Sequence, residues 1–148
     1  MAVLPIITGA TNPILRAKAA KVTSFGKDLH KLISNLLETV HGADGAGLAA
    51  PQVGISQRVT VARIGEEFVP LINPEIIWKS ESIAIAEEGC LSLPNVWLQV
   101  PRSTEIILHF FDPSGEEHER KLAEFDARVV QHEVDHLLGV LIVDYEKQ

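Results

Sequence analysis

The sequence predicts an α+β fold in which mainly antiparallel, short strands pack around a central helix, with one further helix near the N-terminus. Three observations support this fold class. Apolar residues recur at helical spacing over 29–40 and again over 124–138, and the region between them contains short β-branched or alternating runs. The 148 residues and 46% hydrophobic composition indicate one globular domain, spanning 1–148.

The first helix is expected to begin near Gly26, after an irregular segment around Asn12 and Pro13, and to end before His41. Its buried face follows the i, i+3, i+4 rule and comprises Leu29, Leu32, Ile33, Leu36, Leu37 and Val40. His30 and His41 are expected to be solvated or capping residues rather than metal ligands.

The middle of the chain is expected to form strands, which turn residues such as Asn73 and Pro74 separate. The expected strands are 58–64, 68–72, 75–78, 83–86, 104–111 and 117–122. His109 and His118 fall in this region, where paired or surface positions are expected. The second helix is expected over 124–138, and Gly139 is expected to end it.

Charge and apolar runs exclude several classes of protein. Thirteen basic and twenty acidic residues give a net charge of −7, which argues against nonspecific nucleic-acid binding by the whole surface. No apolar run approaches the ~20 residues of a membrane span, and the N-terminus lacks a basic lead-in, so neither secretion nor membrane insertion is expected. A single cysteine excludes an internal disulfide and suits a reducing cytosol.

The stretch from His132 to His136 predicts metal chemistry on the second helix. Residues four apart share one helix face, so both imidazoles can reach one cation. Glu133 then points at whatever that cation activates, which is the arrangement of a metal hydrolase. The expected fold thus places the strands around a central metal-binding helix. A helix with surface histidine and glutamate is the alternative interpretation.

The third ligand is expected upstream of this helix. The longer zinc-protease pattern would place a third histidine where Ile142 stands, and the chain stops at Gln148, too soon for a glutamate from another helix. The candidate is Cys90, because Gly89 beside it allows close backbone approach. Alone, a single cysteine would more often be a small buried apolar residue.

Three segments, in order, resemble the signature motifs of peptide deformylases. They are Gly45-Ala46-Gly47-Leu48-Ala49-Ala50-Pro51-Gln52, Glu88-Gly89-Cys90-Leu91-Ser92 and Gln131-His132-Glu133-Val134-Asp135-His136-Leu137. The opening Asn12-Pro13-Ile14-Leu15-Arg16 also resembles this family, so the likeness covers nearly the whole chain. The resemblance implies removal of the formyl group from the N-terminal formyl-methionine of newly made bacterial-type proteins, with release of formate.

The resemblance also implies roles for individual residues. It implies that Cys90, His132 and His136 hold the metal and that Glu133 handles protons. Gln52 and the backbone N–H of Leu91 would bind the reacting oxygen, as preorganised oxyanion donors do. The family implies Fe²⁺ in the cell, which Zn²⁺, Ni²⁺ or Co²⁺ replace in purified protein, although ligand softness alone suggests zinc.

Substrate contacts are expected beside the metal helix. Phe125, Val129 and part of Arg128 would line an apolar methionine pocket, with plain core packing as the alternative. The peptide main chain would pair near Ala46, Gly47 and Gly89 like an added strand, and Trp97 would stand near the cleft entrance. Glu88 and Arg102 are further expected to pair and hold the loop of Cys90.

Two departures from the family concern peptide and ribosome contacts. Asn95 stands where many deformylases have glycine, and the ending at residues 144–148 lacks the C-terminal helix that docks many bacterial members on the ribosome. The expected partners are N-formyl-methionyl nascent peptides in the cytoplasm of a bacterial-type or infected bacterial cell. The ribosome is left open as a further partner, because anchoring by this helix cannot be assumed. A small peptidase and a structural zinc module are the alternative functions.

Overall fold

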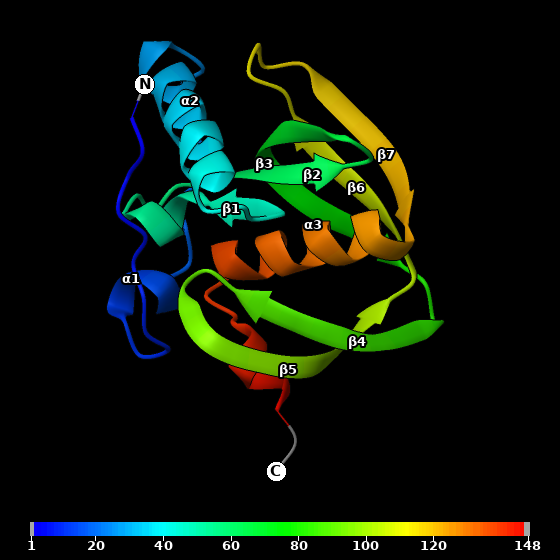
Figure 1. Cartoon of the computed structure of the whole chain (residues 1–148). Helices are drawn as coiled ribbons and strands as arrows, with labels where there is room; N and C mark the ends of the chain where they lie inside the picture. The colour runs from blue at the N-terminus through cyan, green and yellow to red at the C-terminus, as the bar shows by residue number, and fades with distance from the viewer. Residues whose placement is uncertain (1, 147–148) are drawn as a thin grey trace.

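The structure is a computed structural model that describes residues 2–146. Helix α3 lies between a five-stranded sheet, ordered β1-β2-β3-β6-β7, and a two-stranded sheet formed by β4 and β5 (Figure 1). All paired strands are antiparallel. The elements are α1 Pro13–Arg16, α2 Lys27–Gly42, β1 Gly47–Ala49, the 3₁₀ turn η1 Ala50–Val53, β2 Val59–Ile64, β3 Glu67–Lys79, β4 Ile83–Cys90, β5 Leu93–Ser103, β6 Glu105–Phe111, β7 Glu117–Ala123, α3 Glu124–Leu137 and the 3₁₀ turn η2 Ile142–Tyr145. This arrangement confirms the predicted fold class.

The two long helices cover opposite faces of the larger sheet. Val59 and Val61 of β2 belong to the core cluster under α2, whereas Ala62 and Ile64 belong to the cluster under α3. Successive side chains of a strand point to opposite faces, so these two clusters lie on opposite sides of the sheet. Helix α3 is therefore held between two layers of strands.

The long helices lie close to their predicted positions. Helix α2 begins after Gly26, as expected, but continues through Gly42 rather than ending before His41. Helix α3 ends one residue before the predicted limit, and Gly139 follows it with φ of 77°, a conformation that glycine adopts readily. No helix among residues 2–146 is long and apolar enough to cross a membrane.

Strand β3 corrects the sequence prediction, which divided this region into two strands around Asn73. The strand continues through Asn73 and Pro74 with a shift of register against β6. Asn73 adopts φ of 50°, and its side chain accepts a hydrogen bond from the N–H of Val22 and donates one to the carbonyl of Val22. Asn73 and Pro74 thus form an irregularity within β3, and the backbone of Val22 provides the hydrogen-bond partners of the Asn73 side chain.

Strands β1 and β5 were not predicted, and β4 is longer than predicted. The short β1 contains Gly47 and lies at the edge of the large sheet, and β4 extends as far as Cys90. Strand β5 contains Pro94 and Pro101, which weaken the sequence signal for a strand. The β4–β5 hairpin brings Cys90 over α3.

Candidate metal centre

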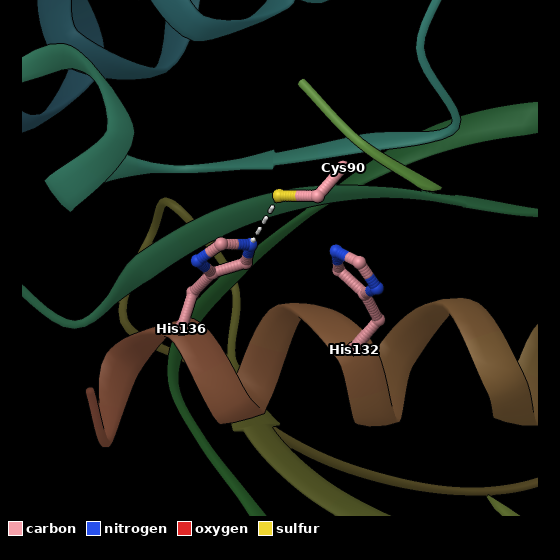
Figure 2. A group of neighbouring side chains, drawn as sticks. All are labelled: Cys90, His132 and His136. Atoms are coloured by element: carbon pink, nitrogen blue, oxygen red, sulfur yellow. Dashed lines mark hydrogen bonds between the residues drawn. The ribbon is translucent and has the colours of Figure 1, made fainter. Parts of the chain in front are cut away.

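Three potential metal-binding atoms converge between the β4–β5 hairpin and α3. The Sγ of Cys90 and one ring nitrogen each of His132 and His136 all lie within 4.8 Å of one another. Figure 2 shows Cys90 pointing toward the two rings, which rise from successive turns of α3. Cys90 Sγ lies 3.4 Å from His136 Nε2. The structure thus brings together the three residues that the sequence predicts as ligands.

The ring atoms are oriented for ligation through Nε2. His132 Nδ1 lies 2.9 Å from Glu88 Oε1, and a carboxylate only accepts, so Nδ1 donates and Nε2 faces Cys90. Burial lowers the pKa of His136 well below its usual value, which keeps this ring in the neutral form that binds metals. One thiol and two imidazoles fit a divalent transition metal.

The other four histidines lie outside this group. His30 and His41 contact the backbone carbonyls of Pro113 and Leu37 at exposed positions. His109 and His118 lie on neighbouring strands, paired with Glu117 and Asp112, as predicted.

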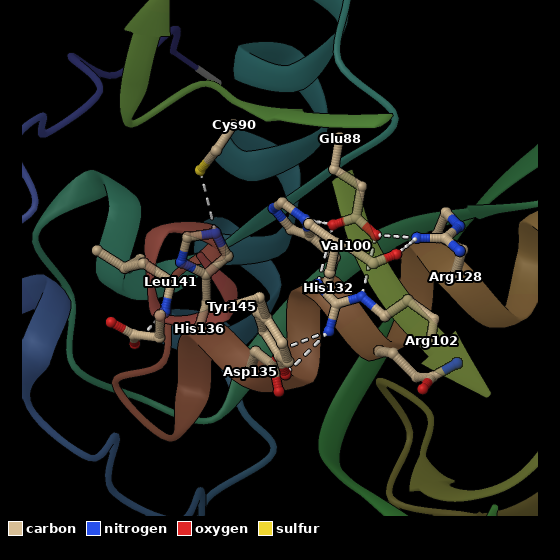
Figure 3. A network of polar contacts seen from close by, with 12 residues as sticks. Glu88, Cys90, Val100, Arg102, Arg128, His132, Asp135, His136, Leu141 and Tyr145 are labelled. Atoms are coloured by element: carbon tan, nitrogen blue, oxygen red, sulfur yellow. Dashed lines mark hydrogen bonds and ion pairs between the residues drawn. The ribbon is translucent and has the colours of Figure 1, made fainter. Parts of the chain in front are cut away.

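Glu88 is buried behind the first histidine and has three cationic or hydrogen-bonding partners. Arg102 donates two hydrogen bonds to it at 2.9 Å each, and Arg128 donates one at 2.6 Å (Figure 3). Burial raises the pKa of Glu88, but hydrogen bonds from Arg102 and His132 outweigh it and lower the pKa to about 2. The predicted Glu88–Arg102 pair is confirmed, and Arg128 joins it from α3.

Glu133 is buried beside the candidate metal-binding atoms. Its burial raises the pKa of the carboxyl from 4.5 to about 7. Its Oε1 has no hydrogen-bond partner among residues 2–146, and its Oε2 faces Gly47, which has no side chain to occupy that space. The carboxylate is therefore poised to exchange a proton near neutral pH.

Gln52 belongs to the 3₁₀ turn η1, and Leu91 directly follows Cys90 at the end of β4. The Gln52 Oε1 accepts from the N–H of Ala49, and its Nε2 donates to Ser92 Oγ at 3.0 Å and lies 3.8 Å from Cys90 Sγ. These contacts fix which way the amide points. None of the loop and turn hydrogen bonds between described backbone groups uses the N–H of Leu91. The Gln52 amide is thus close to a candidate ligand, and Leu91 lines the same cavity as Cys90.

A cavity of about 520 Å³ opens beside this group. Its wall includes every residue predicted from the sequence for substrate contact: Ala46, Gly47, Gly89, Trp97, Phe125, Arg128 and Val129. Trp97 crosses Gly89 so closely that an added Cβ would lie 2.5 Å from Cζ3 of the indole. The cavity wall also includes three residues that were not predicted: Asp44, Leu93 and Val96. Only Asp44 could have been found from the sequence, because it directly precedes the glycine-rich segment that begins at Gly45.

The arrangement is that of a metal-dependent hydrolase. The His-Glu-x-x-His helix meets a third candidate ligand from a distant strand, and a buried glutamate and a cavity lie beside them. Comparison with known families narrows this class. Residues 4–148 match the family described as polypeptide deformylase. The chain belongs to the peptide deformylase family, which is metal-dependent, and its activity is removal of the N-formyl group from newly made polypeptides.

Individual relatives support this assignment along nearly the whole chain. The peptide deformylase of Pseudothermotoga lettingae is 49% identical over 133 residues, which cover 90% of this chain and 77% of the relative. The crystal structure of the Thermotoga maritima enzyme matches with a TM-score of 0.95 and 44% identity, covering 99% of both chains. A class I type b deformylase from Acinetobacter baumannii, bound to Met-ala-ser, matches with a TM-score of 0.92 and 34% identity, covering 97% of this chain and 98% of that one.

Proposed function

We propose that Cys90, His132 and His136 bind one divalent cation and that the surrounding residues use it to deformylate N-formyl-methionyl peptides. The observation that carries this proposal is the convergence of the three ligand atoms within 4.8 Å beside the buried Glu133. When bound, such a cation lowers the pKa of water and polarises a carbonyl oxygen. The cation is Fe²⁺ in the cell, and Zn²⁺, Ni²⁺ or Co²⁺ replaces it in purified protein.

Glu133 transfers the proton in this reaction. Its carboxylate accepts a proton from the attacking water and returns it to the nitrogen of the methionine, because an amine leaves only once it is protonated. A pKa of about 7 suits both halves of this transfer. Gly47 leaves Oε2 without a covering side chain on the β1 side.

Gln52 and Leu91 stabilise the negative charge that develops on the formyl oxygen. The amide of Gln52 is held by Ala49 and Ser92, so its Nε2 is preorganised rather than free to rotate. The Leu91 N–H supplies the second donor. Each such donor typically contributes about 100- to 1000-fold to kcat.

The cavity holds the methionine side chain and the start of the peptide. Val129, Phe125 and the aliphatic part of Arg128 form its wall on the α3 side, and methionine is flexible enough to fill an irregular apolar space. The peptide main chain lies along Ala46, Gly47 and Gly89 as an added strand. Trp97 contacts the residues that follow methionine.

The partners of this reaction are formylated nascent chains in the cytoplasm. The family membership and the single cysteine, which suits a reducing compartment, support this location. The ending for which the sequence predicts no docking helix includes Lys147 and Gln148, which lie outside the described residues, and contact with the ribosome stays a prediction. No direct contact with nucleic acid or membrane is part of the proposal.

Formate release from formyl-Met-Ala-Ser tests the proposal. Protein prepared without oxygen should release formate and leave Met-Ala-Ser intact, and metal analysis should find one equivalent of iron. Glu133→Ala should keep the metal and lose turnover. A near wild-type rate in this variant would reject Glu133 as the proton carrier, and full activity with zinc would reject iron. Cleavage of internal peptide bonds would favour a peptidase.

A further inference from the structure

The C-terminal 3₁₀ turn contacts the polar network behind the metal-binding atoms through Tyr145. The Tyr145 hydroxyl donates to Asp135 Oδ2 at 2.7 Å and accepts from Arg102 Nη1 at 3.3 Å. The Arg102 guanidinium carbon also lies 4.8 Å from the centre of the tyrosine ring. Figure 3 shows this phenol beside Asp135 and Arg102, on the far side of the guanidinium from Glu88. Tyr145 thus contacts the guanidinium of Arg102 through both its hydroxyl and its ring.

Arg102 is held from two sides at once. Its Nη1 donates to Asp135 Oδ2 at 2.6 Å, while Nε and Nη2 donate to the two oxygens of Glu88 at 2.9 Å each. The guanidinium is planar, so a rotation that loosens one pair misaligns the other. The side chain is only 4% exposed, so water does not substitute for a lost partner.

The same network continues to a candidate ligand. Glu88 Oε1, which accepts from Arg102 Nη2, also accepts from Nδ1 of His132. A hydrogen bond to this nitrogen fixes the orientation of a ligating imidazole and its tautomer. A chain of contacts therefore runs from Tyr145 through Arg102 and Glu88 to His132.

We propose that Tyr145 is a positioning residue for the metal site: its hydroxyl holds Arg102 in the orientation that lets Glu88 fix His132 toward the cation. This inference rests on the ligand set of the proposed function. Burial, and then the hydrogen bond to Asp135, raise the pKa of Tyr145 to about 12, so the hydroxyl remains a donor at physiological pH. The ring itself packs against the apolar cluster of Leu141 and Ile142, which phenylalanine can preserve.

Replacement of the hydroxyl alone tests this role. In the full-length, Co²⁺-loaded protein, Tyr145→Phe should weaken Co²⁺ binding about 10-fold in competition with a chelator, the lower end of the effect of partners that orient ligands. The matched control is Asp144→Asn in the same turn, which weakens the exposed ion pair with Arg16 but does not touch Arg102. This control should leave the affinity within about twofold.

A double-mutant cycle separates positioning from a general loss of stability. In the Glu88→Gln background, where the path to His132 is already weakened, Tyr145→Phe should change the affinity less than about twofold. The inference would be overturned if Tyr145→Phe lowers the Co²⁺ affinity equally in both backgrounds, or if it does not lower the affinity in the wild-type background. If Glu88→Gln does not fold, the comparison of Tyr145→Phe with the wild type decides the question alone. Equal Co²⁺ binding by the wild type and Cys90→Ala would instead overturn the ligand set, and this inference with it.

Discussion

Gly47 and Glu133 face each other so closely that a Cβ on Gly47 would lie 2.6 Å from Oε2 of Glu133. Real side chains do not tolerate such a separation, so any residue other than glycine would displace the carboxylate. Gly47 belongs to the edge strand β1 and Glu133 to α3. The position of the Glu133 carboxylate therefore depends on the absence of a side chain at Gly47 on the neighbouring strand.

Gly47→Ala should lower kcat for formyl-Met-Ala-Ser by about 100-fold, because displacement of a catalytic group by about 1 Å has an effect of this size. Metal content should remain that of the wild type. Gly42→Ala is a suitable control, since a Cβ there would meet its nearest neighbour, Val3, only at 3.9 Å. Formate release by Gly47→Ala at more than half the wild-type rate would contradict the proposed placement of Glu133.

Glu133→Gln should change how the stability of the metal-free protein depends on pH. The pKa of about 7 lies above the ordinary 4.5, so the native state retains a proton that the unfolded chain releases. This stabilisation is fully present below pH 4.5 and is lost as the pH rises through 7. Glutamine does not titrate, so between pH 5 and 8 the variant should gain about 2 to 3 kcal/mol over the wild type. Urea unfolding at both pH values measures the difference, and parallel pH dependence would disprove it.

Strand β3 and strand β5 show why part of the fold could not be predicted from local sequence. Asn73 and Pro74 form a strong turn signal, yet β3 continues, because the Asn73 side chain pairs with the backbone of Val22, 51 residues away. The prolines of β5 argue against a strand, but the long pairing with β4 offsets this preference. The long helices were predictable because their apolar periodicity is contained within one segment.

The candidate site likewise has one part that could be predicted from local sequence and one part that could not. The histidine spacing on α3 is local and predicts a shared face, and Cys90 followed from the lack of a downstream ligand. The Glu88–Arg102 pair was expected, but the contacts of Arg128 and Tyr145 with this pair were not. Those contacts depend on how the hairpin, α3 and the C-terminal turn meet, which no spacing in the sequence records.

Glu88→Gln should reduce both stability and metal affinity. It removes one of the two carboxylates that pair with the buried Arg102, and because Asp135 remains we expect a cost of about 3 kcal/mol, the lower end for a broken buried ion pair. Loss of the acceptor for His132 should also weaken metal binding about 10- to 100-fold. Glu105→Gln is the control, because its pair with Lys121 is exposed and should contribute less than about 1 kcal/mol. Similar effects of the two substitutions, by urea unfolding and chelator competition, would contradict a special role for Glu88.

Trp97→Ala should affect peptides that extend beyond the residue after methionine more than shorter ones. The indole lies across Gly89 at the cavity wall, yet the residue remains 65% exposed, so we expect that only a longer peptide covers this apolar surface. Loss of this contact should raise KM for formyl-Met-Ala-Ser about 10-fold, equivalent to about 1.4 kcal/mol, and should leave KM for formyl-Met-Ala within about twofold.

Trp78→Ala provides the matched control for this measurement. Trp78 is also an exposed tryptophan, 43% exposed, but it lies on β3 outside the cavity wall and should change neither constant. An equal rise in KM for the short and long peptides would place the contact of Trp97 at methionine instead. If KM changes for neither peptide, the substrate passes on the other side of Gly89, and the added strand must lie against β1 alone.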